Sequence, residues 1–401
     1  MMKHQFDVVI VGAGMVGLTL ANLLAQCEQC GDLSITVIDA GKKPTFVPGS
    51  DVSLRVSAIA SGSAELFAQI GVWDEIVKIR ACPYQEMRVW DAAGNAEGPE
   101  TLCFDAAEFA VPQLGFIIEN VLIQVALLNK LQSSDVSVEF ETPITSLNKV
   151  GERFEVELGS NTKLKPDLLI GADGAASFVR SNAGIGATSW LYSQTAFVTH
   201  LQPEQSHRNT AWQRFLKTGP VGLLPLADGR VSTVWSTTAA QAAEALKASD
   251  EQLSALLTAA TDNVLGQLKP TGPRGSFPLK AQHADHYVLA GLALVGDAAH
   301  AVHPLAGQGA NLGLADAEML ASVISDALAA NENPGDLPLL RNYERARKGA
   351  NKTMLHFIDG LNRLFSNDSI SLARLRGTGM RMFNSSGPIR ERAVQVALGI
   401  R

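Results

Sequence analysis

The sequence predicts an α/β fold (α+β overall) with a Rossmann-like domain, an inserted sheet-rich domain and a C-terminal helical segment. An apolar strand at Phe6–Val11 leads into a glycine-rich turn, a helix from Met15 to about Ala25 and a second strand at Ser34–Asp39. This order of elements begins a parallel α/β sheet. Residues 190–280 instead contain several strand-like runs, and the chain from 339 onward is mostly helical in pattern.

The remaining helices are predicted from apolar periodicity. They lie at about Ser61–Ile70, about Asn120–Leu131 and about Leu312–Ala330. Within the strand-rich region only one clear helix is expected, at about Asp250–Ala260. The predicted domains are therefore a discontinuous Rossmann-like domain (1–80, 100–188 and 285–335), a sheet-rich domain (81–99 and 189–284) and the helical segment 336–401.

Composition excludes several classes of protein. The chain has 401 residues, of which 46% are hydrophobic and 18% charged, which suits two buried cores and not a disordered or coiled-coil chain. The net charge of −7 gives no support for nucleic-acid binding. Four cysteines, with one C-x-x-C pair at Cys27 and Cys30, form neither a disulfide framework nor a typical zinc site, so no metal is expected.

Charge is distributed unevenly along the chain. Residues 341–401 hold 12 Lys/Arg and 4 Asp/Glu, a net of +8, and an apolar stripe from Met354 to Phe365 follows helical spacing, with Arg374 and Arg376 beyond it. This segment either contacts anionic lipid or a partner protein, or packs on the acidic body. No stretch resembles a signal peptide or a membrane span. We therefore expect a cytoplasmic protein, either free or peripheral on the inner face of the membrane.

The glycine-rich turn has the spacing of a dinucleotide-binding fingerprint. Gly12 would make the tight turn, Gly14 would let a pyrophosphate approach the backbone, and Gly17 would let the helix pack close to the strand. The helix N-terminus would then face the phosphates. Asp39 ends the second strand, where a carboxylate can bind ribose hydroxyls. This motif alone fits FAD and NAD equally well.

Two further motifs follow buried strands. Asp173 and Gly174 end the run DLLIGAD, and Gly296-Asp297 ends a strand that leads into a Pro/Gly-rich loop and a helix near Gly313. A carboxylate at the carboxyl end of a strand points into the ligand crevice of an α/β sheet. The three motifs in this order resemble the flavoprotein aromatic hydroxylases of the p-hydroxybenzoate hydroxylase fold. Within that group, Arg55–Ile59 and the run HPLAGQGANLG resemble the ubiquinone-biosynthesis ring hydroxylases.

The resemblance implies an FAD-dependent monooxygenase that uses O2, NAD(P)H or another electron donor, and a flavin C4a-hydroperoxide. Its substrate would be a polyprenylated phenol or benzoquinol. The implied FAD-binding positions are Gly12, Gly14, Gly17, Asp39, Arg55, Asn120, Asp173, Gly174, Asp297, Gly307, Gly309, Ala310 and Asn311. Relatives often carry Arg or Gln at the position of Asn120, so this residue is a departure from the family pattern.

The resemblance also places Pro304 and Gly309 at the reactive face of the flavin. His300 and His303 are the nearest candidates for a base that would activate the phenol, although both also fit structural hydrogen bonding within the loop. Tyr192, Tyr287 and Trp235 either line the substrate site or pack in the core. A flavin hydroxylase of a soluble aromatic compound and a non-oxygenating FAD reductase or scaffold remain alternatives. A biosynthetic complex and a homo-oligomer also stay open as assemblies.

Overall fold

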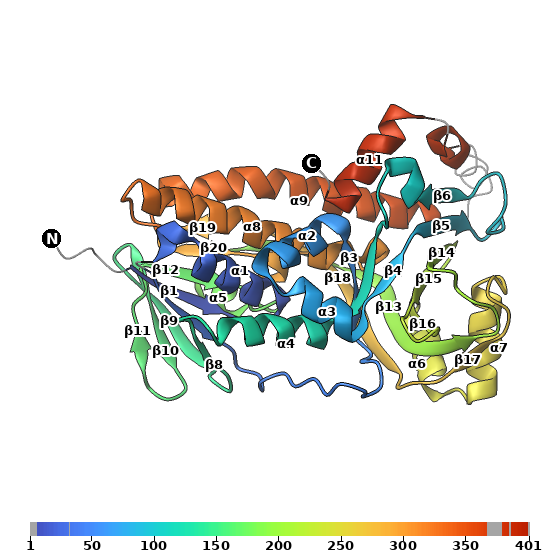
Figure 1. Cartoon of the computed structure of the whole chain (residues 1–401), viewed down its shortest axis with the longest axis horizontal. Helices are drawn as coiled ribbons and strands as arrows, with labels where there is room; N and C mark the ends of the chain where they lie inside the picture. Colours follow the sequence, from blue (N-terminus) through green and yellow to red (C-terminus); the bar gives the residue numbers. More distant parts are fainter. Residues whose placement is uncertain (1–5, 32, 367–378, 385, 400–401) are drawn as a thin grey trace.

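The computed structural model describes residues 6–31, 33–366, 379–384 and 386–399. Figure 1 shows an elongated molecule with an α/β lobe at one end, a sheet-rich lobe at the other and long helices along one side. The predicted fold class, with an inserted sheet and a helical C-terminal segment, is confirmed.

The α/β lobe contains a six-stranded sheet in the order β19-β20-β12-β1-β2-β8. Its members are β19 (Val288–Leu289), β20 (Leu292–Leu294), β12 (Leu168–Gly171), β1 (Phe6–Val11), β2 (Leu33–Ile38) and β8 (Ser137–Glu139). All neighbours from β20 to β8 pair in parallel. The central strands are apolar almost throughout because helices cover both faces of a parallel sheet.

Helices lie where periodicity predicts them at α1 (Met15–Gln26), α2 (Ser61–Ile70), α4 (Asn120–Leu131) and α8 (Gln308–Ala329). Helix α3 (Trp73–Arg80) and the short α5 (Phe178–Asn182) complete this lobe, and periodicity did not predict them. Helix α2 ends at Gly71, whose φ of 82° is the left-handed conformation that glycine adopts at helix ends. In α3, Asp74 lies in the first turn and Arg80 in the last, where each charge is favourable to the helix dipole.

The second lobe is built on a large sheet with the order β21-β18-β13-β16-β15-β14-β5-β6, to which β17 adds by pairing with β13. Its strands are β5 (Glu86–Asp91), β6 (Leu102–Asp105), β13 (Ala187–Pro203), β14 (Thr210–Leu216), β15 (Gly219–Pro225), β16 (Val231–Thr237), β17 (Leu268–Pro270), β18 (Gly275–Ala284) and β21 (His300–Ala301). The sheet continues to residue 105, past the predicted limit at 99, because β6 forms an antiparallel pair with β5.

Two helices cover the outer face of this sheet. Helix α7 (Asp250–Ala260) was expected, and a capping box formed by Ser249 and Gln252 fixes its start. Helix α6 (Ala239–Lys247) was not expected. It is rich in alanine, the residue with the highest helix propensity. The Thr238 side chain caps it by accepting a hydrogen bond from Gln241 N.

Two small sheets and several single turns complete the body. The sheets are β9 (Ile144–Val150) with β10 (Arg153–Leu158) and β11 (Lys163–Leu164), and β3 (Val56–Ala60) with β7 (Gly115–Glu119) and β4 (Cys82–Tyr84). The turns are the 3₁₀ helices η1 (Glu28–Cys30), η2 (Ala106–Phe109), η3 (Gly296–Ala298) and η4 (Leu305–Gly307).

The C-terminal segment folds back over both lobes. Helix α9 (Leu337–Phe365) lies along α8, and α11 (Pro388–Leu398) lies near β6 (Figure 1). At the end of α9, Phe365 stacks on Phe215 of β14 with ring centroids 4.1 Å apart. Basic residues of this segment pair with acidic residues of the body, as in the contact of Arg390 with Glu108 at 2.6 Å. The expectation that the segment packs on the acidic body is therefore confirmed for its described part.

Two of its predicted basic residues, Arg374 and Arg376, lie outside the described residues. None of the described helices has both the length and the apolar composition needed to cross a membrane.

Candidate active site

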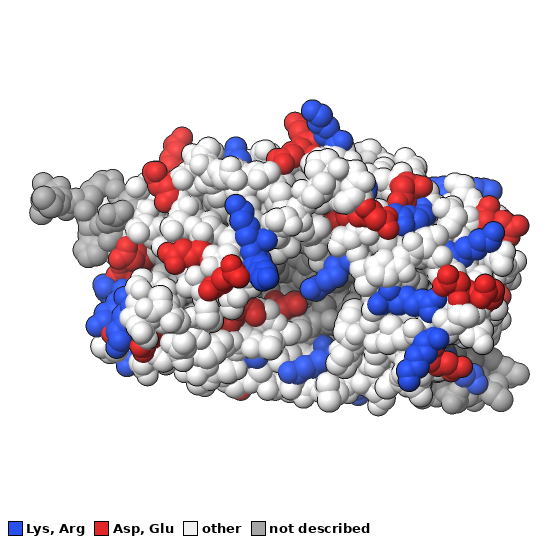
Figure 2. Space-filling model, turned by 90° about the horizontal axis from the view of Figure 1, so that it is seen from below, with Lys and Arg blue, Asp and Glu red and all other residues white. Residues whose placement is uncertain are grey.

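A cavity of about 910 Å³ lies between the two lobes. On one side it is lined by the loops that follow β1, β2, β12 and β20. On the other side it is lined by the face of the large sheet at β14, β15 and β16. Figure 2 shows the molecule hollowed near the middle of one face, with charged side chains around the hollow. The carboxyl ends of parallel strands are the usual ligand site of an α/β sheet, and the volume suits a large cofactor together with a substrate.

The glycine-rich turn forms one end of this cavity. Gly12 has φ 110°, and a Cβ atom there would lie 2.4 Å from the carbonyl oxygen of Ala172. A Cβ at Gly17 would lie 2.0 Å from the Gly12 carbonyl oxygen, so this glycine allows close packing of α1 and does not itself line the cavity. A Cβ at Gly14 would meet no atom within 4 Å. The backbone at Gly14 therefore leaves open space for a group in the cavity.

Two aspartates hold the surrounding loops. The Asp39 carboxylate accepts hydrogen bonds from Ala13 N at 2.7 Å and Gly41 N at 2.6 Å. The Asp173 carboxylate accepts from Ser177 Oγ at 2.5 Å and Val179 N at 3.1 Å, which fixes the start of α5. Both residues line the cavity. Because a carboxylate has about four acceptor positions, Asp39 retains capacity for ribose hydroxyls.

The loop from Gly296 to Asn311 forms a second wall. Asp297 is exposed only toward the cavity. Desolvation by the surrounding protein raises the pKa of its carboxyl, and the nearby His300 and Arg55 partly oppose this shift. Pro304, Gly307, Gly309 and Ala310 line the same wall.

Asn311 does not line the cavity. Its side chain ties this loop to β3 by donating to Ala58 O at 2.9 Å and accepting from Ala60 N at 2.9 Å.

A buried ionic cluster supports that loop from behind. Asp316 of α8 is fully buried and accepts hydrogen bonds from His300 Nε2 at 2.5 Å, Arg347 Nε at 2.7 Å and Gly296 N at 3.1 Å. Asn351 Nδ2 donates to the same carboxylate at 2.9 Å. Burial alone would raise the pKa of Asp316, but His300 and Arg347 outweigh it and hold the pKa below its usual range. The cluster fixes the backbone immediately before Asp297.

His300 therefore does not line the cavity, against the expectation that it lies near the flavin as a candidate base. Its bond to Asp316 of α8 fits a structural role for this residue. His303 does line the cavity, and its Nε2 lies 3.2 Å from Gln194 Oε1, with the Tyr192 ring packed edge-on against the imidazole. Burial lowers the pKa of His303 to about 4, so the ring is neutral at pH 7.

The three aromatic residues considered for the substrate site pack elsewhere. Tyr287 and Trp235 are buried in the cores of the two lobes, and Tyr192 packs against His303, so none of the three lines the cavity. The sheet wall is instead formed by side chains that no motif marked. They are Met87, Ala211, Gln213, Pro220, Leu224, Val234 and Ser236, with Tyr84 of β4 beside them. Trp212 also borders the cavity, but its ring packs on the opposite face of the sheet with the core that includes Leu223.

Helix α4 supplies two amides to the cavity. Asn120 lines it and accepts a hydrogen bond from Ser57 Oγ at 2.7 Å. Gln124 also lines it, one turn later on the same helix face, and donates to Ala13 O at 3.4 Å. Sequence reasoning missed Gln124, although its spacing of four from Asn120 could have revealed it. Arg55 lines the cavity as well and is exposed.

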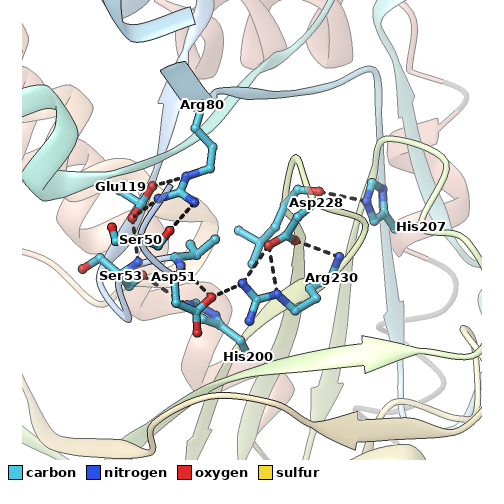
Figure 3. Close-up of polar contacts among 11 residues, drawn as sticks. Ser50, Asp51, Ser53, Arg80, Glu119, His200, His207, Asp228 and Arg230 are labelled. Atoms are coloured by element: carbon cyan, nitrogen blue, oxygen red, sulfur yellow. Dashed lines mark hydrogen bonds and ion pairs between the residues drawn. The ribbon is translucent and has the colours of Figure 1, made fainter. Parts of the chain in front are cut away.

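The segment that carries Arg55 is held by polar contacts from both lobes (Figure 3). Arg80 Nη1 donates to Ser50 O at 2.9 Å, and Ser53 N donates to Glu119 Oε1 at 2.6 Å. From the sheet lobe, His200 Nε2 lies 3.1 Å from Ser53 O. Arg230, in the turn between β15 and β16, pairs with Asp51 and with Asp228. Residues 50–55 therefore contact both lobes beside the cavity.

Comparison with known proteins decides the family. The model of the FAD binding domain family matches residues 5–357. The chain belongs to this family. It is 36% identical over 403 residues to the 3-demethoxyubiquinol 3-hydroxylase of Escherichia coli, with 100% of both chains covered. It is also 36% identical to the mitochondrial ubiquinone biosynthesis monooxygenase COQ6 of Danio rerio, with 98% of this chain and 90% of the relative covered.

Solved structures support the same fold. The structure of Pseudomonas aeruginosa PqsL in complex with 2-aminobenzoylacetate superposes with a TM-score of 0.77. The match covers 94% of this chain and 99% of that one, at 21% identity. FAD is the cofactor of this FAD-binding protein, and the predicted class of enzyme, an FAD-dependent hydroxylase that uses O2, is confirmed.

The residues present fit FAD. Open space at Gly14 and at Gly174, where a Cβ atom would also meet nothing within 4 Å, leaves room for a large group against the backbone. The predicted positions that line the cavity are Gly12, Gly14, Asp39, Arg55, Asn120, Asp173, Gly174, Asp297, Pro304, Gly307, Gly309 and Ala310. Gly17, His300 and Asn311 lie behind this layer and support it.

Proposed function

We propose that this FAD-dependent monooxygenase hydroxylates the aromatic ring of a polyprenylated phenol or benzoquinol in ubiquinone biosynthesis. One observation carries the proposal: a single cavity connects the FAD-binding loops to a largely apolar sheet face. The full-length similarity to a 3-demethoxyubiquinol 3-hydroxylase supports this class of substrate.

The FAD-binding half of the cavity would position the cofactor. The backbone at Gly14 and the N-terminus of α1 would face the pyrophosphate, since unpaired N–H groups at a helix start attract anions. Asp39 would accept hydrogen bonds from the adenosine ribose, and Asp297 would contact the ribityl chain or the pyrophosphate. When bound, FAD supplies the oxygen chemistry that side chains perform poorly.

The chain's own residues at the sheet wall would hold and shield the substrate ring. Met87, Leu224 and Val234 provide apolar surface that excludes water from the reacting atoms. Gln213 and Ser236 are polar groups on the same wall and can orient ring hydroxyls by hydrogen bonding. Pro304 and Gly309 lie on the loop wall of the same cavity and would contact the flavin.

This arrangement does not identify a single side chain as the base that would activate the substrate. His303 is neutral, and its Nε2 lies beside Gln194 Oε1. It would therefore serve as a neutral hydrogen-bonding group of the cavity wall and not as a charged group. An electron-rich benzoquinol also needs less activation than a phenol. We infer that NAD(P)H or another reduced donor supplies electrons from the mouth of the cavity, where Arg55 is exposed.

The polyprenyl tail of the proposed substrate indicates where the protein would act and what it would contact. A polyprenyl chain resides in the membrane, so we propose a cytoplasmic protein that contacts the inner face of the membrane, or a biosynthetic complex, through residues 341–401. Exposed apolar side chains on this segment, Phe357 and Leu364, support this contact. We also propose that the protein can assemble as a homo-oligomer.

Mass spectrometry of quinone intermediates in a strain that lacks this protein tests the function. We expect a prenylated precursor that lacks one ring oxygen to accumulate, and the wild-type gene to remove it. An unchanged quinone profile would contradict the proposal. The purified enzyme should also couple donor oxidation to hydroxylation of a short-chain benzoquinol. Quantitative peroxide release with added substrate would instead favour a non-oxygenating flavoprotein, and faster turnover of a tail-less phenol would favour a soluble substrate.

A further inference from the structure

The C-x-x-C pair lies in a tight turn at the end of α1. Helix α1 ends at Gln26, Cys27 caps it, and η1 (Glu28–Cys30) follows at once. Cys30 N donates a hydrogen bond to Cys27 O at 3.0 Å. Side chains three residues apart eclipse each other in a 3₁₀ turn. The turn therefore places the two free thiols on the same side of the backbone, with no bond between them.

The two thiols have different surroundings. Cys30 is buried in the core of the α/β lobe, and burial raises the pKa of its thiol. Cys27 is half-buried, and its sulfur lies 3.1 Å from Ser325 Oγ of α8 and 3.4 Å from Gln29 Oε1. Burial alone would raise the pKa of Cys27, but hydrogen bonds from Cys30, Ser325 and the turn backbone lower it overall. Cys27 is thus the accessible and more acidic member of the pair.

The other two cysteines lack these features. Burial raises the pKa of Cys82 to about 11, and that of Cys103 is raised to about 12 by burial and by the neighbouring Glu86 carboxylate. Neither residue belongs to a C-x-x-C spacing. The FAD and substrate cavity uses neither Cys27 nor Cys30, since neither lines it. The proposed hydroxylase function therefore leaves this pair unexplained.

We propose that Cys27 and Cys30 form a reversible dithiol/disulfide site that is oxidised by hydroperoxides. The Cys27 thiolate attacks the O–O bond of hydrogen peroxide, so that an S–O bond forms and one water leaves. The Cys30 sulfur then attacks the Cys27 sulfur, so that the S–S bond forms, the S–O bond breaks and a second water leaves. The two thiols lose two electrons and two protons, and the peroxide is reduced to water.

The proposed function supplies a source of this oxidant. Reduced flavin that reacts with O2 without transferring oxygen releases hydrogen peroxide. Only this choice of oxidant rests on the proposed function, because the thiol geometry does not depend on it. Oxidation would also remove the Cys27 proton and so weaken the contact with Ser325, which links the end of α1 to α8. These two helices begin directly after Gly14 and Gly307, which border the cavity.

Peptide mass spectrometry of the reduced, FAD-loaded enzyme tests the site. After treatment with added hydrogen peroxide and alkylation, we expect loss of two alkylatable thiols and a Cys27–Cys30 disulfide that dithiothreitol reverses. Cys82 and Cys103 should remain alkylatable. In Cys30→Ser, Cys27 should stop at a sulfenic acid that dimedone traps, and in Cys27→Ser, Cys30 should stay a thiol. Ser325→Ala is the matched control, because it removes the same contact and should still form the disulfide.

Two outcomes would overturn the proposal. One is oxidation of Cys27 to the sulfinic acid while Cys30 remains alkylatable in the wild-type enzyme. The other is that both thiols resist oxidation and alkylation until a chelator is added, which would indicate a bound metal ion. Because peroxide is added, the test gives its result whether or not the enzyme hydroxylates a quinol. A second arm, turnover without substrate in the presence or absence of catalase, separates failure of the oxidant source from failure of the site.

Discussion

The two halves of the cavity are built from different parts of the chain. The FAD-binding half consists mainly of backbone, with Gly12 and Gly14 in a tight turn and carboxylates that hold loops in place. The sheet half consists largely of side chains, among them Met87, Gln213 and Leu224. A backbone site tolerates few substitutions, whereas a side-chain wall can change with the substrate.

The largest expected effect comes from the ionic cluster behind the FAD-binding half. Asp316→Asn removes the negative charge that pairs with Arg347 and accepts the hydrogen bond of His300 inside the protein. Breaking a buried ion pair costs about 3–5 kcal/mol, so we expect this loss in urea unfolding, together with poor retention of FAD on gel filtration. Asp326→Asn, at an exposed position of the same helix, is the control. A loss below about 1 kcal/mol would show that the cluster does not hold the loop.

A substitution at the sheet half should separate substrate binding from cofactor binding. Gly222 lines the cavity on β15, and a Cβ atom there has its nearest neighbours 3.8 Å away. Gly222→Leu should therefore fold, fill the wall and reduce kcat/KM for the quinol by roughly 10–200-fold, as steric misfit in an apolar pocket does. FAD affinity should not change, and Gly222→Ala should be mild. Loss of FAD from Gly222→Leu would mean that the halves are not independent.

The contrast between the two halves also explains what sequence could predict. The strands around Gly12, Asp173 and Asp297 were predicted because backbone geometry demands glycine and short polar residues at set spacings. The sheet wall was not, because Met87 and Ala211 look like any other residues of buried or half-buried strands, and only pairing between distant strands brings them together on one face.

Other errors have similar causes. Tyr287 and Trp235 were considered for the substrate site on residue type alone, and long-range packing places both in cores. His300 was ranked by its neighbours in the chain, but its partner Asp316 comes from the next helix. Helix α6 was missed although its alanine-rich run favours a helix and Thr238 supplies an N-cap.

Acid should destabilise the junction between the halves through His303. Its folded pKa of about 4 lies below the unfolded value of about 6.5, so the unfolded chain takes up a proton first as the pH falls. Stability is therefore retained above the unfolded pKa and decreases between about pH 6.5 and pH 4, by about 2 kcal/mol from pH 7 to pH 5 for this residue. Urea unfolding at both pH values measures the change.

His303→Gln should flatten this pH dependence. The exposed His356→Gln is the matched control and should leave the pH dependence unchanged. An equal pH slope in wild type and His303→Gln would assign the effect to the other buried histidines, His200, His207 and His283, whose pKa values burial also lowers.

The smallest expected effect tests the backbone half most directly. Gly14→Ala adds a methyl group where the protein leaves open space, at an ordinary φ of −74°. The apoprotein should keep its stability, while FAD affinity falls by about tenfold, or about 1.4 kcal/mol, because the methyl group occupies space needed by the cofactor.

Gly17→Ala should do the opposite and destabilise the apoprotein, since its Cβ would clash with the Gly12 carbonyl. Gly349→Ala, also in open space but on the exposed face of α9, should stabilise the helix by up to about 1 kcal/mol without changing FAD affinity. Isothermal titration with FAD and thermal unfolding of each apoprotein distinguish the three glycines, and unchanged FAD affinity in Gly14→Ala would contradict a backbone cradle at this turn.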